Sequence, residues 1–143
     1  YLRLRGYTAH LLANVPLEWL AKLGLSRQDV GIDIIAFDME GRPHAVQCKF
    51  RSRGIVSWRD LSTFEALCAR TGPWRRHVVM TNASAVKRQG LKQPKDSTIA
   101  RGTFATLSRH EWTRLAGFGS GRTVGGETSP VTARRAFLDN ITR

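Results

Sequence analysis

The sequence has few cysteines, few acidic residues and no long hydrophobic run. Its two cysteines, Cys48 and Cys68, lie in apolar surroundings, and its four histidines are scattered, so no zinc site is predicted. We interpret the cysteines as thiols of a reduced, intracellular compartment. No apolar run approaches the ~18–20 residues that cross a bilayer, and no signal peptide or GxxxxGK[ST] phosphate loop occurs. Because the chain begins at Tyr1, we expect a piece of a longer protein.

Charge is the strongest compositional signal. The chain has 23 lysines and arginines against 11 acidic residues, a formal net charge of +12 over 143 residues. In a chain of single-domain length, this excess favours a polyanionic partner. Nucleic acid is the first expectation, and a membrane surface is disfavoured because no strongly amphipathic basic helix is present. A basic protein without such a partner is the alternative.

Hydrophobic patterning predicts an α/β (α+β layered) domain with a mixed β-sheet flanked by helices. A turn rich in glycine and proline separates two of the strands and predicts a β-hairpin. Residues 85–97 are expected to form a short helix and a loop. The expected helices are 10–25, 58–70 and 108–115, and the expected strands are 31–38, 44–50, 77–81 and 103–107.

The composition changes near the C-terminus. Glycines occur at positions 117, 119, 121, 125 and 126, which indicates a flexible linker. We therefore expect one domain over residues 1–117. Residues 118–143 are expected to hold a Gly-rich linker and the start of a following segment.

The segment AVQCKF, residues 45–50, places two polar side chains inside an apolar strand. Burying a lysine without a partner is costly, so Lys49 calls for an explanation. Side chains alternate along a strand, so Gln47 and Lys49 share one face and Cys48 points to the other. If the hairpin centres on Gly41, Asp33 lies opposite Lys49 and joins this face. That pairing requires a loop with an odd number of residues, because a shift by one residue would turn Asp33 away.

A carboxylate, an amide and an ammonium on one surface suit metal-assisted hydrolysis of phosphodiesters. Asp33 would hold a hard cation such as Mg²⁺, with Mn²⁺ as a substitute. Gln47 or the backbone carbonyl of Cys48 would add an oxygen ligand. Lys49 would orient or help deprotonate a water, or stabilise charge on a phosphate. The alternative is an ion pair between Lys49 and Asp33 without catalysis.

The motifs GID at residues 31–33, VQCKF at 46–50 and VVMTNAS at 78–84 together resemble the PD-(D/E)XK nuclease superfamily. The resemblance is to its restriction-endonuclease-like Mrr branch, which carries Gln in place of the second acid, and it covers roughly residues 9–115. It implies a restriction-endonuclease-like core and a Mg²⁺-dependent DNA endonuclease. Similar domains occur at the N-terminus of large restriction or helicase polypeptides, which implies a helicase or other DNA-processing module in the same chain.

The resemblance also implies roles for individual residues. Asp33 resembles the metal-binding acid, Gln47 stands at the second acidic position, and Lys49 resembles the catalytic lysine. The family often adds an acid from the first helix, for which Glu18 is the candidate. An ordinary solvent-facing glutamate is the alternative for Glu18.

Basic residues along the chain are expected to bind the DNA backbone, together with Asn82 at the end of a strand. The basic residues are Arg51, Arg53, Arg75, Arg76, Lys87, Arg88, Lys92 and Lys95. Trp58 and Trp74 would stack on bases, although packing is the more frequent role of such residues.

The sequence therefore predicts a metal-dependent DNA endonuclease domain of a larger restriction or DNA-processing protein. Three alternatives stay open. One is a non-cleaving nucleic-acid-binding module of the same fold, which the neutral Gln47 favours. The second is a structure-selective junction nuclease acting as a homodimer, and the third is a nuclease directed at RNA.

Overall fold

The computed structural model describes residues 1–29, 31–51, 54–88 and 93–119. The sheet has the order β1-β2-β3-β4-β5, in which β1, β2 and β3 pair antiparallel while β3, β4 and β5 pair parallel. This mixed sheet confirms the expected fold class. The elements, with η for short 3-10 helices, are η1 (Arg3–Arg5), β1 (Thr8–Leu11), η2 (Leu12–Asn14), α1 (Leu17–Leu23), β2 (Ile34–Phe37), β3 (Pro43–Lys49), α2 (Trp58–Arg70), β4 (Arg76–Thr81), β5 (Asp96–Ile99), α3 (Arg101–Ala105) and α4 (Arg109–Gly119).

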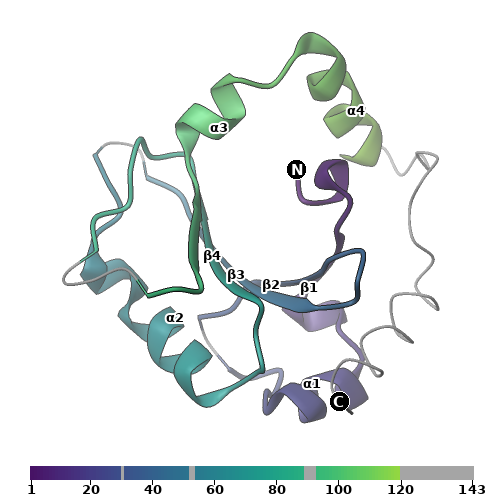
Figure 1. The fold of residues 1–143 in the computed structure, drawn as a ribbon, viewed down its shortest axis with the longest axis vertical. Coiled ribbons are helices and arrows are strands. Elements are labelled where there is room, and N and C mark those ends of the chain that lie inside the picture. Colours follow the sequence, from purple (N-terminus) through teal and green to yellow (C-terminus); the bar gives the residue numbers. More distant parts are fainter. Residues whose placement is uncertain (30, 52–53, 89–92, 120–143) are drawn as a thin grey trace.

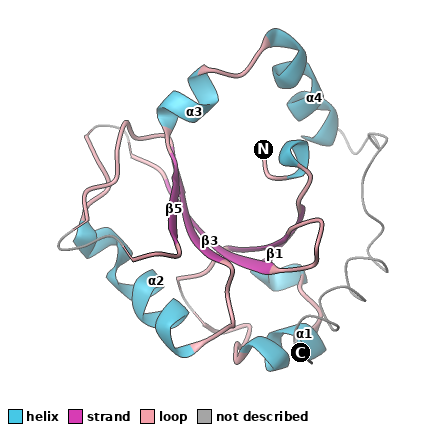
Figure 2. Ribbon diagram, viewed as in Figure 1, coloured by secondary structure: helices cyan, strands magenta, loops and turns pink. Residues whose placement is uncertain are grey.

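The sheet separates two layers (Figures 1 and 2). Helices α1 and α2 lie against one face, while η1 and α4 lie together on the other side. An ion pair between Arg5 and Glu111, 3.0 Å long, joins η1 to α4. The linker was expected over residues 118–143. Its part beyond residue 119 lies outside the described residues.

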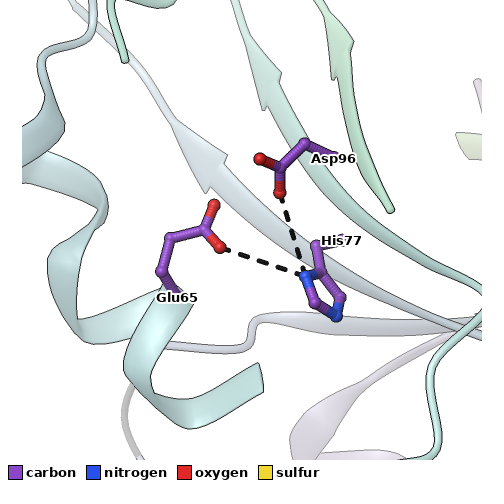
Figure 3. A group of neighbouring side chains, drawn as sticks. All are labelled: Glu65, His77 and Asp96. Atoms are coloured by element: carbon purple, nitrogen blue, oxygen red, sulfur yellow. Dashed lines mark ion pairs between the residues drawn. The ribbon is translucent and has the colours of Figure 1, made fainter. Parts of the chain in front are cut away.

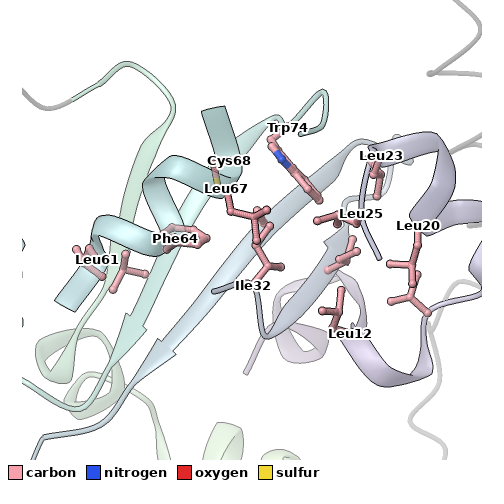
Figure 4. Close-up of a cluster of buried hydrophobic side chains, with 14 of the residues drawn as sticks. Leu12, Leu20, Leu23, Leu25, Ile32, Leu61, Phe64, Leu67, Cys68 and Trp74 are labelled. Carbon is pink, nitrogen blue, oxygen red and sulfur yellow. The ribbon is translucent and has the colours of Figure 1, made fainter. Parts of the chain in front are cut away.

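Both faces of the central strands are buried, which explains why their sequence is almost continuously apolar. The larger core fills the space between the sheet and helices α1 and α2, and includes Ile35, Ala45 and Val79 from the strands. Figure 4 shows part of this core, with Leu20 of α1 and Phe64 of α2 among the labelled side chains. A smaller core on the opposite face includes Ala36 and Val46. Gln47 and Lys49 follow Ala45 at two-residue spacing, so they belong to the face that the helices cover.

The helix expected over residues 10–25 is wrong in its first half. Those residues form the end of β1, then η2, and only then α1. Pro16 precedes the helix with an extended backbone, and β1 pairs with β2 along its whole length. The apolar spacing misled the prediction because Leu12 and Trp19 enter the same core from different elements. Gly24 ends α1 as expected, with φ of +75°.

Two further strand and helix assignments differ from expectation. The strand expected over residues 103–107 is wrong, because residues 101–105 form α3. The true edge strand, β5, lies in the preceding polar segment DSTI, which carries little apolar signal. In the described part of residues 85–97, Val86 forms a β-bridge with Val56 in place of the expected short helix.

Candidate active site

A five-residue turn over residues 38–42 fixes how β2 and β3 pair, because Phe37 lies opposite Pro43. The Asp38 carboxylate accepts hydrogen bonds from the backbone nitrogens of Glu40 and Arg42 and from Arg42 Nε. Gly41 takes φ of +76°, which glycine adopts without strain. The odd-numbered loop is confirmed. Its centre is Glu40 instead of Gly41, so each pairing is shifted by two residues.

This register brings Asp33 to Gln47 rather than to Lys49. The backbone nitrogen of Asp33 donates to the Val46 carbonyl at 2.9 Å, which extends the pairing beyond β2. Gln47 Nε2 donates to Asp33 Oδ2 at 2.6 Å, and the Cys48 backbone nitrogen donates to the same oxygen at 2.8 Å. The carboxylate of Asp33 is therefore held by two groups of β3.

Lys49 ends β3 on the same face, half-buried and opposite Thr81 of β4. Among the described residues it forms no ion pair, so the Asp33–Lys49 ion pair weighed as an alternative is not formed in this structure. The lysine lies two residues beyond Gln47, at the end of the sheet where β3 and β4 both finish.

The oxygen atoms at this point suit a hard cation. Asp33 uses Oδ2 for both hydrogen bonds, and no described residue donates to its Oδ1. Gln47 Nε2 also lies 3.4 Å from the Cys48 carbonyl oxygen. Turning the Gln47 amide over would present Oε1 in the place of Nε2. Carboxylate, amide and carbonyl oxygens are the ligands that Mg²⁺ accepts, so the donor set fits that ion.

Glu18 lies exposed in the first turn of α1. The contacts of Asp33 described above come from β3 and not from α1. A part for Glu18 in the site therefore remains a prediction.

Asn82 ties the chain after β3 to the end of β4. Its Oδ1 accepts a hydrogen bond from the Arg51 backbone nitrogen at 2.8 Å, and its Nδ2 donates to the Arg51 carbonyl at 3.0 Å. The Arg51 guanidinium forms an ion pair with Asp60, which also accepts hydrogen bonds from Ser57 at the start of α2. Sequence reasoning took Asn82 for a DNA contact and missed this positioning role, which only the register of β3 and β4 reveals.

A basic surface, formed by Arg51, Arg59 and Lys87, surrounds the start of α2. All three residues are exposed. Lys87 and Arg59 line a surface pocket of about 370 Å³ beside Trp58. Arg59 was not singled out in the sequence, although its place in the first turn of a helix next to an exposed tryptophan was the available signal.

Other expected DNA contacts lie elsewhere. Arg76 starts β4 opposite His44, whereas Thr81 ends β4 opposite Lys49. At ~3.3 Å per residue, Arg76 is roughly 16 Å along the sheet from the lysine, and Arg75 lies one residue farther still. Lys95 precedes β5 at that same distant end, where its carbonyl accepts from the His77 backbone nitrogen.

Two predicted contacts are engaged within the protein, Arg88 at intermediate exposure and Trp74 fully buried. The Arg88 side chain is 11% exposed and its Nη1 lies 2.6 Å from Glu65 Oε1, so the guanidinium is engaged inside the protein. Trp74 is 3% exposed and packs in the larger core, which corrects the expectation that it stacks on bases. Arg53 and Lys92 lie outside the described residues.

Comparison with known proteins adds one finding. A family model described as restriction endonuclease matches residues 11–115. Searches of curated proteins and of solved structures gave no match. Within the described ranges, no helix combines the length and apolar character needed to cross a bilayer.

Proposed function

Because the chain belongs to the restriction endonuclease family, we propose that it hydrolyses phosphodiester bonds of DNA with the help of a divalent cation. The match covers residues 11–115 and agrees with the five-stranded mixed sheet. The observation that carries the proposal is the contact of Asp33 with Gln47, two residues before Lys49 on the same face of β3. A carboxylate, an amide and an ammonium thus occupy one end of the sheet.

The proposed roles follow from the donor atoms. Asp33 would hold the cation, with Gln47 Oε1 and the Cys48 carbonyl oxygen as further ligands, and Glu18 is a candidate for an additional acid. When bound, Mg²⁺ supplies Lewis-acid stabilisation of charge at the phosphate, and Mn²⁺ can replace it. Lys49 orients the attacking water and stabilises the charge that develops on the phosphate.

The basic surface at the start of α2 is the proposed grip on the DNA backbone. Arg51 leaves β3 two residues after Lys49, and its ion pair with Asp60 places it beside α2. Lysines and arginines that neutralise phosphates release counterions, which favours binding to polyanions at moderate salt. The net charge of +12 supports the same partner. Trp58, 39% exposed, is available to stack on a base.

The wider context is proposed from the family resemblance alone. We infer a larger restriction or DNA-processing polypeptide that includes a helicase or similar module, with homodimerisation as a further option. Both cysteines are free thiols, which suits a reduced, intracellular compartment.

Nicking of supercoiled plasmid with Mg²⁺ or Mn²⁺ tests the proposal. We expect Lys49→Ala and Asp33→Asn to cut about 10²–10⁴-fold more slowly than the unmodified protein. Filter binding should show that both variants still hold DNA. Lys22→Ala, which changes an exposed lysine of α1, is the matched control and should cut normally.

The rival function is a non-cleaving module of the same fold. It is favoured by the orientation of Gln47, which presents a nitrogen to Asp33. Firm DNA binding without cleavage in either metal would establish that rival and reject the nuclease. Cleavage of an RNA competitor in preference to DNA would instead change the substrate class.

A further inference from the structure

A second group of ionisable side chains lies between α2 and the sheet, away from Asp33. Glu65 comes from α2, His77 from β4 and Asp96 from β5, and the two carboxylates point at the imidazole ring (Figure 3). His77 Nδ1 lies 3.9 Å from Glu65 Oε2 and 3.9 Å from Asp96 Oδ1. His77 precedes Thr81, the partner of Lys49, by four residues, so the two groups are roughly 13 Å apart along the sheet.

Two atoms of this group lack hydrogen-bond partners although they are buried. They are His77 Nδ1 and Asp96 Oδ1, which face one another at a distance beyond hydrogen-bonding range. The Asp96 side chain is only 3% exposed, and its other oxygen accepts from the Gln93 backbone nitrogen at 2.9 Å. Buried polar atoms without partners cost free energy, so a species that contacts both atoms would be stabilising.

The charge of the group points to a cation. Glu65 and Asp96 bring two carboxylates, and Arg88 brings one guanidinium, whose Nη1 lies 2.6 Å from Glu65 and 3.4 Å from Asp96. His77 Nδ1 is buried without a hydrogen-bond partner, so a neutral imidazole can offer its lone pair there to a ligand bond.

We propose that Glu65, His77 and Asp96 form a binding site for a divalent transition-metal ion, separate from the site at Asp33. One imidazole nitrogen and two carboxylate oxygens are donors that Zn²⁺ accepts, whereas Mg²⁺ prefers oxygen ligands alone. The three donor atoms lie within 4.8 Å of one another. Two ligands of a tetrahedral zinc ion are about 3.4 Å apart, so each of the two 3.9 Å contacts of His77 Nδ1 must shorten by about half an ångström when the ion binds.

Arg88 competes with the ion for the same carboxylates. Its Nη1 contacts both Glu65 and Asp96, while its Nη2 is buried without a partner. Replacing the guanidinium removes one positive charge and frees two carboxylate oxygens. A metal site predicts that Arg88→Gln binds the ion more tightly, whereas a purely structural ion-pair network predicts no gain.

Equilibrium dialysis of Zn²⁺ against the chelator-treated protein tests the site. We expect one tight Zn²⁺ per chain, and an affinity at least about tenfold lower in His77→Gln and in Asp96→Asn. The matched control is His110→Gln, an exposed histidine of α4, which should bind as the unmodified protein does. An undiminished affinity in His77→Gln, or an equal loss in His110→Gln, overturns the proposal.

X-ray absorption of the Zn²⁺-loaded protein needs no variant, so its result cannot be explained by a substitution that disturbs folding. We expect a first shell of nitrogen and oxygen with the outer-shell scattering of one imidazole. Cys68, a buried free thiol, lies three residues after Glu65 on α2, about one helical turn away. Sulfur in the first shell would place the ion on a cysteine and overturn the proposed ligand set.

Discussion

Gln47 donates a hydrogen bond of 2.6 Å from Nε2 to Oδ2 of Asp33, and this bond closes the end of the β2–β3 pairing. An amide can satisfy a neighbouring carboxylate without any cation, whereas a second carboxylate would repel it. The neutral residue at position 47 therefore lets this end of the sheet fold before an ion binds. The same side chain can present its oxygen once an ion is there.

The substitution Gln47→Glu tests this relation. It replaces a donor by a like charge, so we expect the free energy of unfolding without metal to fall by about 1–3 kcal/mol. Mg²⁺ at millimolar concentration should restore much of that loss, since two carboxylates then share a cation. Urea denaturation with and without Mg²⁺ measures both effects. Gln28→Glu, on an exposed residue, is the control, and an equal loss there would remove the support for a special pair.

The clamp of Asn82 on Arg51 predicts a coupled loss of stability and activity. Asn82→Ala deletes two hydrogen bonds, so stability should fall by about 1 kcal/mol. The plasmid-nicking rate should fall further than DNA affinity, because Lys49 lies two residues before the released segment. Asn14→Ala makes the same change on an exposed residue of η2 and should leave both unchanged. A normal nicking rate in Asn82→Ala would show that the clamp does not position the lysine.

The start of α2 depends on a capping box formed by Ser57 and Asp60. Ser57→Ala removes a hydroxyl that lies 2.9 Å from Asp60 Oδ2, and we expect a loss of about 1 kcal/mol in thermal or chemical unfolding. Ser62→Ala changes an exposed serine within the same helix, where alanine is the better helix former. If both variants lose the same stability, the cap is not the cause.

Stability should decline when the pH falls below about 6.5, the ordinary pKa of histidine. Burial lowers the pKa of His10, His44 and His77, so the unfolded chain binds protons in a range where the folded chain does not. The free energy of unfolding then decreases as protons are added. Glu65 acts in the opposite direction, because burial raises the pKa of its carboxyl group.

Urea denaturation between about pH 7.5 and 5.5 measures this slope. His10→Gln should make the decline shallower, since Nε2 of that ring is buried without a partner. His110→Gln, on the exposed surface of α4, should leave the slope as it is. A flat stability profile in the unmodified protein would contradict the expectation for all three histidines.

Local signals sufficed for some parts of the fold. The bounds of α2 were predicted correctly because its apolar stripe, its serine cap and the stop at Gly72 agree. The capping box of α4 was equally plain, with Ser108 and Glu111 bonded to one another's backbone. Strand β5 was missed because its four residues owe their pairing to the edge of β4 and not to their own composition.

The sequence predicted which face of β3 carries the site, but not which residue of β3 lies opposite Asp33. Alternation along β3 is a local property, so Gln47 and Lys49 were placed on one side from sequence alone. Which of them meets Asp33 depends on the hydrogen bonds that Asp38 makes inside the turn, and no count of residues reveals these. His77 meets Asp96 because the two are register partners in the parallel pairing of β4 and β5, which lies further still from any local pattern.

The turn at residues 38–42 also bears on how this chain can vary. Its length decides, from several residues away, which side chain faces Asp33. A single-residue insertion or deletion that slips β3 by one position would rotate Gln47 and Lys49 to the opposite face. Length changes in this loop should therefore be as damaging as replacing the lysine itself, even though the loop supplies none of the proposed site residues. Whether the turn accepts insertions or deletions therefore indicates whether the protein still needs Gln47 and Lys49 on the face of Asp33.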